Sequence, residues 1–385
     1  MKLAGPVFQW RPDNRFRLLI DGPTFFPRMI EAIRRAERRI DIELYLVEDG
    51  YCVDRMIEVL CQAAARGVEI RCLLDGFGCL NLSQANRRRL SEVGVALRVY
   101  NPLSLRLRFR NLHRDHRKIL LIDDCIGFVG GAGVTDDFWN PEKGGAFWHE
   151  AMVEMKGPVL DDWQLLFDGQ WHSCIERRIW QLPLPRKIPD VPDIPWGASG
   201  HGRVAYAAAR QHRDVVRSLV RAMAQARERI WLTTPYFLPG GKLRRAMFRA
   251  ARRGVDVRLV LTGRNTDHPP VRYAGQRFYP GLLRAGVRIY EYQPHFSHLK
   301  MAMVDGWVSV GSCNFDHWNL RWNLEANLEA VDPTLAGQAH ECFCNDFAQS
   351  ELIDLDDWRE RSWFTRLNQA LWGTVDRVVM RFFNG

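Results

Sequence analysis

The sequence predicts an α/β protein built from two pseudo-symmetric domains, each with a mixed, largely parallel β-sheet, packed against each other. Three observations support this: four segments recur in the same order in both halves, each copy alternates helical and β-rich patterns, and a proline-rich stretch separates the copies. At 385 residues, with 46% hydrophobic and 26% charged, the chain is long enough for each half to bury its own core.

The repeat consists of four matched pairs of segments. Each copy alternates segments of helical period, ending in Arg-Gly or Ala-Gly, with short β-rich runs such as VEIRCLL or VDVRLVL, which is typical of βα units. Gly67, Gly254 and Gly286 stand where a helix C-cap is expected. The first copy comprises 32–47, 63–76, 90–102 and 116–134, and the second comprises 222–238, 250–263, 282–294 and 298–315.

Proline marks the boundary between the two domains. Residues 179–200 contain five prolines, which neither a helix nor a central strand accommodates. We therefore expect an N-terminal domain over 1–178, a linker over 179–200, a C-terminal domain over 201–350 and an amphipathic helical segment over 351–385.

Charge and cysteine content narrow the partners and the cellular setting. The net charge of +9 favours an acidic partner, which nucleic acid and an anionic bilayer satisfy equally. Nine cysteines without CxxC pairs or metal-ligand spacing indicate a reducing compartment, and argue against disulfides and a zinc site. Because no uninterrupted apolar run reaches about 18 residues, we expect neither a signal peptide nor a membrane span, and only peripheral contact with a bilayer.

Each copy of the repeat carries one HxKxxxxD pattern. Because residues i and i+2 project from the same face of a strand, each His should point with its Lys, whereas the Asp at i+7 has the opposite parity. The Asp falls at a turn between two apolar runs, so we assign it a supporting role at a hairpin corner. The six residues are His116, Lys118 and Asp123 in the first half, and His298, Lys300 and Asp305 in the second.

Two histidines and two lysines could exchange a phosphodiester. The chain has only seven lysines against 47 arginines, yet both motifs keep Lys, which favours a compact ammonium that meets a phosphoryl oxygen. One imidazole attacks phosphorus, the lysines stabilise the equatorial oxygens, and the other imidazole protonates the departing alkoxide. An incoming alcohol then displaces the phosphohistidine. This chemistry needs no cofactor or metal, and the sequence shows no acidic cluster suited to magnesium or calcium.

These residues resemble the phospholipase D superfamily, whose two HKD motifs meet at a domain interface to make one active site. The resemblance spans most of the chain. Within the superfamily the chain is most similar to bacterial cardiolipin synthases, through GSCNFDHWNLRWNLEANLEA (311–330) and TPYFLPG (234–240). The resemblance implies two phospholipase D-like domains and a phosphatidyltransferase. Its donor would be phosphatidylglycerol or another phospholipid, and its acceptor a second phosphatidylglycerol.

The resemblance also assigns roles to residues. His116 would be the nucleophile and His298 the general acid/base. The family places an acidic residue after each motif that orients the histidine of the opposite half, so Glu325 would pair with His116 and Glu150 with His298. An ordinary salt bridge is the alternative for either glutamate. The expected phosphate-binding residues are Lys118, Lys300, Asn314, Ser312 and Gly131.

One position departs from the family pattern. The family often has an Asn after the double glycine of the first motif, equivalent to Asn314 in the second, but this chain has Gly133 there. We expect backbone amides of residues 131–133, or the hydroxyl of Thr135, to replace the missing donor.

Two segments suit a membrane interface. Residues 106–117 interleave basic and apolar side chains just before the first motif, although an exposed basic strand has the same pattern. At the C-terminus an apolar stripe with helical spacing predicts an amphipathic helix, which could contact a membrane or dock onto the protein core. The stripe is Phe364, Leu367, Leu371, Val375, Val378 and Phe382, with Arg366, Arg377 and Arg381 between them.

Aromatic residues near the second motif could form a dry wall that favours a lipid hydroxyl over water, or could belong to the core. They are Phe315, Trp318, Trp322, Tyr236 and Phe237.

Three other functions remain possible from the sequence: a phospholipase D that hydrolyses headgroups, a nuclease of the same superfamily, and a membrane-binding scaffold with a relic site. We favour the synthase. The expected partners are anionic phospholipids and the membrane surface, without nucleic acid. The expected state is a monomer with an intramolecular active site, peripheral to the inner membrane on its cytoplasmic side.

Overall fold

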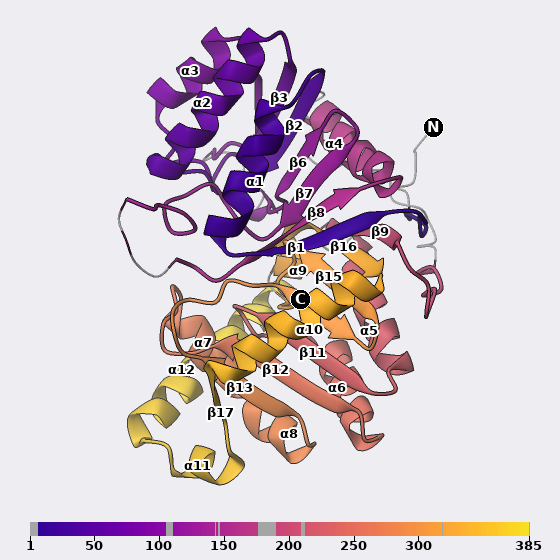
Figure 1. The fold of residues 1–385 in the computed structure, drawn as a ribbon. Helices are drawn as coiled ribbons and strands as arrows, with labels where there is room; N and C mark the ends of the chain where they lie inside the picture. Colours follow the sequence, from indigo (N-terminus) through magenta and orange to yellow (C-terminus); the bar gives the residue numbers. More distant parts are fainter. Residues whose placement is uncertain are drawn as a thin grey trace.

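The computed structural model describes residues 7–104, 111–142, 144, 147–175, 190–208, 212–317 and 319–384. Two mixed β-sheets lie at the centre of the molecule, one in each half of the chain, and helices cover their outer faces (Figure 1). The basic segment 106–117 is described only from Asn111 onward.

The first half forms a seven-stranded sheet of order β1-β8-β7-β6-β2-β3-β4. Its elements are β1 (Arg15–Ile20), α1 (Gly22–Arg34), β2 (Arg39–Leu44), α2 (Tyr51–Ala65), β3 (Glu69–Asp75), α3 (Gln84–Glu92), β4 (Ala96–Tyr100), β5 (Arg114–Asp115), β6 (Ile119–Ile122), β7 (Ile126–Gly130), β8 (Ala151–Lys156) and α4 (Val159–Ile175).

The second half forms a sheet of order β10-β9-β16-β15-β14-β11-β12-β13-β17, to which β5 of the first half also pairs. Its elements are β9 (His201–Ala208), β10 (His212–Arg213), α5 (Asp214–Gln225), β11 (Arg229–Thr234), α6 (Gly241–Arg252), β12 (Asp256–Thr262), α7 (Pro269–Gln276), α8 (Tyr279–Arg284), β13 (Arg288–Tyr292), β14 (Met301–Val304), β15 (Trp307–Gly311), α9 (Asn319–Trp322), β16 (Asn323–Val331), α10 (Pro333–Ala348), β17 (Ser350–Leu352), α11 (Leu355–Glu360) and α12 (Trp363–Asn384).

The predicted duplication is confirmed by topology. The order β1-β8-β7-β6-β2-β3-β4 recurs strand for strand as β9-β16-β15-β14-β11-β12-β13. The sheets are mixed, as predicted. Among strands of the same half, parallel pairing is limited to β2–β3–β4 and β11–β12–β13, because the hairpins that follow each HxK add antiparallel neighbours. Gly67, Gly254 and Gly286 follow helices with φ of 90°, 86° and 87°, which confirms the predicted C-caps.

Three hydrophobic clusters account for the layers. One lies between the first sheet and α1–α3, and another between the second sheet and α5, α6 and α8. The third joins the facing sides of the two sheets and includes α4 and α10. Helix α4 contacts β9 of the other half, and α10 contacts the equivalent strand β1, so the two halves clamp each other symmetrically.

The two motif aspartates occupy hairpin turns, as parity predicted. Asp123 and Asp305 have positive φ (54° and 48°), a conformation that Asp tolerates better than most residues. The carboxylate of Asp123 accepts three backbone N–H groups of residues 37–39 at 2.8 Å, and that of Asp305 accepts those of residues 227–229 at 2.9–3.0 Å. Each Asp therefore connects a hairpin turn to the start of a neighbouring strand. It lies at the end of its strand that is farther from the motif histidine.

The predicted domain boundaries fall partly outside the described residues, because 176–178 of the N-terminal domain and 179–189 of the linker are not among them. Strand β17 pairs with β13, so the second sheet continues just past residue 350. The cysteines are all free, and five of the nine are buried. Of the helices in the described part of the chain, none combines the length and apolar character needed to cross a membrane.

Helix α12 forms over the predicted C-terminal segment, but it docks through its polar face. Arg277 of α7 donates to Asp376, and Gln369 donates to Gln276 at 3.0 Å. The apolar stripe of residues 364–378 remains in solvent, with Phe364 58% and Leu371 54% exposed. Docking of this stripe onto the core, one of the two alternatives, is therefore excluded; the side chains of Arg381 and Phe382 lie outside the described part.

Candidate active site

Each HxK segment is hydrogen-bonded to the backbone of the opposite half. Strand β5 runs parallel to the start of β16, and the N–H of His116 donates to the carbonyl of Leu324 at 2.9 Å. A second parallel bridge links the other motif to the first half, and the N–H of His298 donates to the carbonyl of His149 at 2.8 Å. Each accepting residue immediately precedes a glutamate, so this register delivers one carboxylate to each histidine.

The two histidine–glutamate pairs are crossed, as predicted. His116 Nδ1 lies 3.0 Å from Glu325 Oε2, and His298 Nδ1 lies 2.7 Å from Glu150 Oε2. The glutamates are almost completely buried, whereas the imidazole side chains remain 9% and 10% exposed. Neither half therefore holds a complete pair, and the rings are the part of each pair that solvent reaches.

The two motif lysines make the same backbone hydrogen bond. Each Nζ donates to the backbone carbonyl of the histidine in its own motif, at 2.6 Å for Lys118. Lys300 Nζ also lies 3.1 Å from Glu150 Oε2 and 2.9 Å from His298 Nδ1. Both lysines are buried. These contacts agree with the predicted i, i+2 parity of His and Lys.

The histidines and lysines form one electrostatic cluster. Burial lowers the pKa of His116, opposed by Glu325, and lowers the pKa of His298 well below its ordinary value, reinforced by Lys300 and Lys118. Burial also lowers the pKa of Lys118 to about 7, opposed by Glu325. Because Lys118 acts on the pKa of His298 and Lys300 acts on that of His116, the two motifs form one site rather than two.

The lowered pKa values favour the neutral form of both imidazoles, and the two rings have different neighbours. When Nδ1 of His116 donates to Glu325, the free lone pair is on Nε2, and this tautomer can attack phosphorus. Nδ1 of His298 instead faces both a carboxylate and the ammonium of Lys300. The two halves thus share a backbone fold, but their histidines differ in the side chains that contact Nδ1.

Equivalent positions of the repeat, Gly131 and Ser312, hold the two glutamates differently. Ser312 Oγ donates to Glu325 Oε2 at 2.5 Å. At Gly131 a Cβ would lie 2.1 Å from Glu150 Oε2, so glycine leaves room for this carboxylate. The N–H of Gly131 donates to a carbonyl of β8 at 3.3 Å. Both residues were expected to bind phosphate, but their contacts support the glutamates instead.

Asn314 and Thr135 keep unused hydrogen-bonding capacity. Each is 1% exposed, and neither Asn314 Oδ1 nor Thr135 Oγ1 has a hydrogen-bond partner among the described residues. Buried polar atoms are normally satisfied, so a bound group could engage them. At Gly133 an added Cβ would lie 2.7 Å from the carbonyl oxygen of Leu46, which excludes the asparagine common in the family.

Sequence analysis missed two residues that position the motifs. Asp75 Oδ2 accepts the N–H of Asp115, the residue before His116, at 2.9 Å. Thr262 Oγ1 donates to the carbonyl of Ser297, the residue before the other histidine, at 3.1 Å. Asp75 and Thr262 occupy the same place in the repeat, at the ends of segments 63–76 and 250–263. Their equivalence was the signal available in the sequence.

Four aromatic rings lie around the imidazoles, and none of them was predicted from the sequence. Tyr45 contacts the His116 ring at 4.7 Å between centroids. Three rings lie around His298 at 5.5–5.7 Å: Phe138, Trp148 and Phe296. The position of Trp148 two residues before Glu150 was the one sequence signal for this group.

The aromatic wall proposed from sequence is only partly at the site. Phe237 and Phe315 belong to the core of the second half. Trp322 contacts His113, and Tyr236 contacts Phe296 at 6.5 Å. Trp318 lies outside the described residues.

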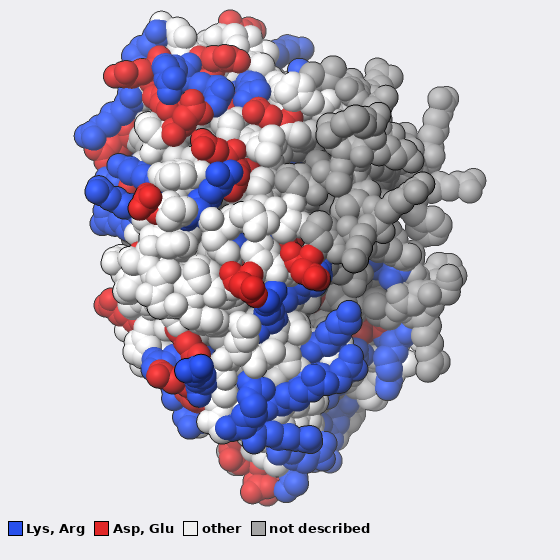
Figure 2. Space-filling view, turned by 90° about the vertical axis from the view of Figure 1, so that its right-hand side faces the viewer, with Lys and Arg blue, Asp and Glu red and all other residues white. Residues whose placement is uncertain are grey.

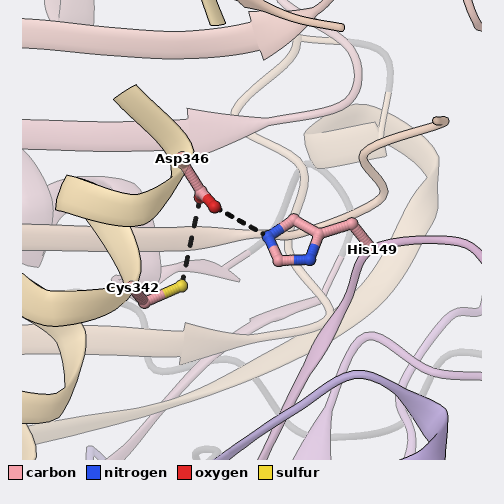
Figure 3. Close-up of side chains that lie close together, drawn as sticks. All are labelled: His149, Cys342 and Asp346. Atoms are coloured by element: carbon pink, nitrogen blue, oxygen red, sulfur yellow. Dashed lines mark hydrogen bonds and ion pairs between the residues drawn. The ribbon is translucent and has the colours of Figure 1, made fainter. Parts of the chain in front are cut away.

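Among the described residues, one group of possible metal ligands lies close together: His149, Cys342 and Asp346 (Figure 3). His149 Nε2 lies 3.1 Å from Asp346, and Nδ1 lies 2.9 Å from Asp21. Burial lowers the pKa of His149, but the hydrogen bonds to Asp21 and Asp346 outweigh it and raise this pKa well above its ordinary value. A raised pKa favours the protonated ring, which offers no lone pair to a metal. We therefore interpret the group as an ion pair between His149 of the first half and Asp346 of the second.

Comparison with known families agrees with this geometry. The family model described as "Cardiolipin synthase, PLD-like domain" matches residues 29–171 and 219–347, well over half of the chain. The chain belongs to this family. Its PLD-like relatives include Cardiolipin synthase A of Pseudomonas fluorescens, 32% identical over 95% of this chain and 74% of the relative. Cardiolipin synthase of Geobacillus kaustophilus is 30% identical over 92% of this chain and 70% of the relative.

Solved structures share the fold of this PLD-like chain. Phosphatidylserine synthase of Haemophilus influenzae superposes with a TM-score of 0.72 at 14% identity, covering 99% of this chain and 95% of that one. Polyphosphate kinase of Porphyromonas gingivalis gives a TM-score of 0.58 at 15% identity, covering 89% and 49%.

The space at Gly131 leads to a testable prediction. Gly131→Ala should displace the Glu150 carboxylate from His298 and lower kcat on a phosphodiester by about 100-fold, in the range seen when a partner that orients a site residue is lost. Gly306→Ala is the matched control, because nothing lies within 4 Å of a Cβ there. Equal kcat values in the two variants would contradict the role assigned to Gly131.

Proposed function

We propose that this protein is a cardiolipin synthase that transfers a phosphatidyl group through a phosphohistidine. The observation that carries the proposal is the crossed pairing of His116 with Glu325 and of His298 with Glu150, which brings both motifs into one cluster. The names of its relatives supply the product, cardiolipin. The phospholipid donor and the phosphatidylglycerol acceptor are those that the family resemblance implies.

In the first step, Nε2 of His116 attacks the phosphorus of the donor lipid. The bond from phosphorus to the headgroup oxygen breaks, and His298 gives a proton to this oxygen. Lys118 and Lys300 stabilise the charge on the equatorial oxygens, together with Asn314. A bound phosphodiester anion raises the pKa of His298 and so opposes the effect of burial.

In the second step, a hydroxyl of the acceptor phosphatidylglycerol attacks the same phosphorus. His298, now neutral, takes the hydroxyl proton, and the bond between phosphorus and Nε2 of His116 breaks. The product is a tetra-acyl lipid, and the free imidazole is restored. Because one chain supplies both motifs, a monomer is sufficient for the reaction.

We place the protein peripherally on the cytoplasmic side of the inner membrane. Helix α12 exposes five of the six apolar residues of the predicted stripe, with Trp363 beside them. An exposed apolar helix face of this size is typical of interfacial helices. The free cysteines agree with a reducing compartment.

A basic surface lies on a different side of the second half. Figure 2 shows Lys and Arg gathered over the lower part of the face that is on the right in Figure 1, where α6 lies. Five basic residues of α6 and its C-terminal end are exposed: Lys242, Arg245, Arg249, Arg252 and Arg253. This charge suits any polyanion, so a nuclease is the competing function that the experiment must separate.

Labelled phosphatidylglycerol tests the function. The pure protein should yield a tetra-acyl lipid and glycerol, and His116→Ala should abolish the product, whereas His172→Ala, at an exposed histidine of α4, should not. Phosphatidic acid as the sole product would indicate a hydrolase, and salt-sensitive DNA cleavage without lipid turnover would indicate a nuclease.

Acid quenching with phosphorus-labelled lipid should place the label on His116; label on His298 alone would reverse the two roles.

The pKa of Lys118 leads to a prediction about pH. The profile of kcat/KM reports groups of the free enzyme. Because an ammonium with a pKa of about 7 loses its charge as pH rises, kcat/KM should fall above about pH 7. In Lys118→Arg the fall should move to higher pH, since arginine stays protonated. Lys242→Arg, at an exposed position of α6, should leave the profile unchanged, and an identical alkaline limb in all three proteins would refute the assignment.

Vesicle binding tests the role of α12. Leu371→Glu places a charge in the exposed apolar stripe and should weaken co-sedimentation with vesicles of phosphatidylglycerol by about tenfold or more, because a charge resists burial in the acyl region. Ala370→Glu places the same charge one residue away, outside the stripe, and should bind more tightly than Leu371→Glu. Equal binding of the two variants would contradict membrane contact through this face.

A further inference from the structure

A cavity lies between α7 and α12, next to the second motif. Its volume is about 350 Å³, and most of its lining residues are apolar or aromatic, among them Leu238, Val271, Ala274, Trp372, Val375 and Val379. The space opens to solvent on one side, where Val375 is 40% exposed, so its apolar lining can take up a ligand from outside and make van der Waals contacts with it. Among the described residues of the first half, neither α7 nor α12 has a counterpart, so the cavity lies outside the duplicated layers.

One end of the cavity approaches the catalytic cluster. Tyr236 lines the cavity, and its ring contacts Phe296 at 6.5 Å between centroids. Phe296 in turn contacts the ring of His298 at 5.7 Å. Asp316 and Asn319 also line the cavity and follow Asn314 closely in the chain. A group bound in the cavity would therefore lie two ring contacts from the imidazole.

The other end of the cavity meets the exposed stripe of α12. Val375 lines the cavity and is itself 40% exposed as a member of the stripe. The ion pair of Asp376 with Arg277 and the hydrogen bond of Gln369 to Gln276 hold α12 on α7. Because polar contacts fix the helix, the apolar side chains between α7 and α12 are left to line the space.

We propose that this cavity binds one fatty acyl chain of the phospholipid whose phosphodiester lies between the two histidines. The proposal rests on the function proposed above and names a site for the apolar part of that substrate. An acyl chain suits the apolar lining, and a glycerophospholipid places its chains a few bonds from its phosphate. The cavity accordingly continues from the stripe that faces the bilayer to the aromatic rings beside His298, so a chain can remain in apolar surroundings while its headgroup reacts.

The site can be tested by filling it. Val271, half-buried on α7, is changed to Trp, and Val93→Trp, at the exposed valine that follows α3, is the matched control. Two substrates are compared: dioleoyl-phosphatidylglycerol in mixed micelles and bis(p-nitrophenyl) phosphate, a phosphodiester without acyl chains. Val271→Trp should lower kcat/KM for the lipid by about tenfold or more, because each methylene group that loses burial weakens binding. Its kcat/KM for the chain-free diester should stay within about twofold of wild type, as should both activities of Val93→Trp.

The chain-free diester also guards against misfolding. Val379→Trp fills the cavity from α12 and should give the same selective loss. Equal loss on both substrates in both variants, or no loss on the lipid, would overturn the acyl site while leaving the proposed function in place. A wild-type protein that turns over the diester but makes no tetra-acyl lipid would overturn the proposed function, and with it this site.

Discussion

The site depends on hydrogen bonds that cross between the two halves. The N–H groups of His116 and His298 each donate to a carbonyl of the opposite half, and the next residue along from each carbonyl is the glutamate that binds the same histidine. Burying carboxylates and ammonium groups is costly unless each has a partner. Since the partners of each half lie on the other, the cluster is satisfied only when the halves are joined in this register.

Two layers of support keep that register. The core between the sheets includes α4 and α10, each of which contacts a strand of the opposite half. One residue away from Glu150, His149 pairs with Asp21 of its own half and with Asp346 of the other, and the second pair joins the halves. The backbone next to Glu150 is therefore held in two ways. The side chain of His149 pairs with Asp346, and its carbonyl accepts the N–H of His298.

Much of the fold and part of the site could be predicted from the sequence. The duplication was visible because hydrophobic pattern and turn glycines repeat together, and the place of Asp123 and Asp305 followed from strand parity. Crossed pairing came from family resemblance, since no local pattern reveals which half a glutamate faces. The contacts of Gly131 and Ser312 with the two glutamates could not be predicted, because they depend on how closely Glu150 approaches Gly131 and Glu325 approaches Ser312 in the folded chain.

The C-terminal helix shows a second limit. Its apolar stripe was evident, but periodicity cannot tell whether a stripe faces a core or the solvent. The decision lies in Gln369 and Asp376, whose partners Gln276 and Arg277 are about a hundred residues earlier in the chain. Polar docking of this kind leaves an apolar face outward, which is costly in water and favourable at a bilayer.

Joining two copies of one unit in a single chain has a consequence for the chemistry. A symmetric dimer of identical units would give both imidazoles the same surroundings, and every change would appear twice. Here one copy has a glycine where the other has a serine, and both lysines donate to a backbone carbonyl, but Lys300 also contacts a glutamate. Fusion freed the two histidines to diverge, so one can specialise in bonding to phosphorus and the other in moving protons.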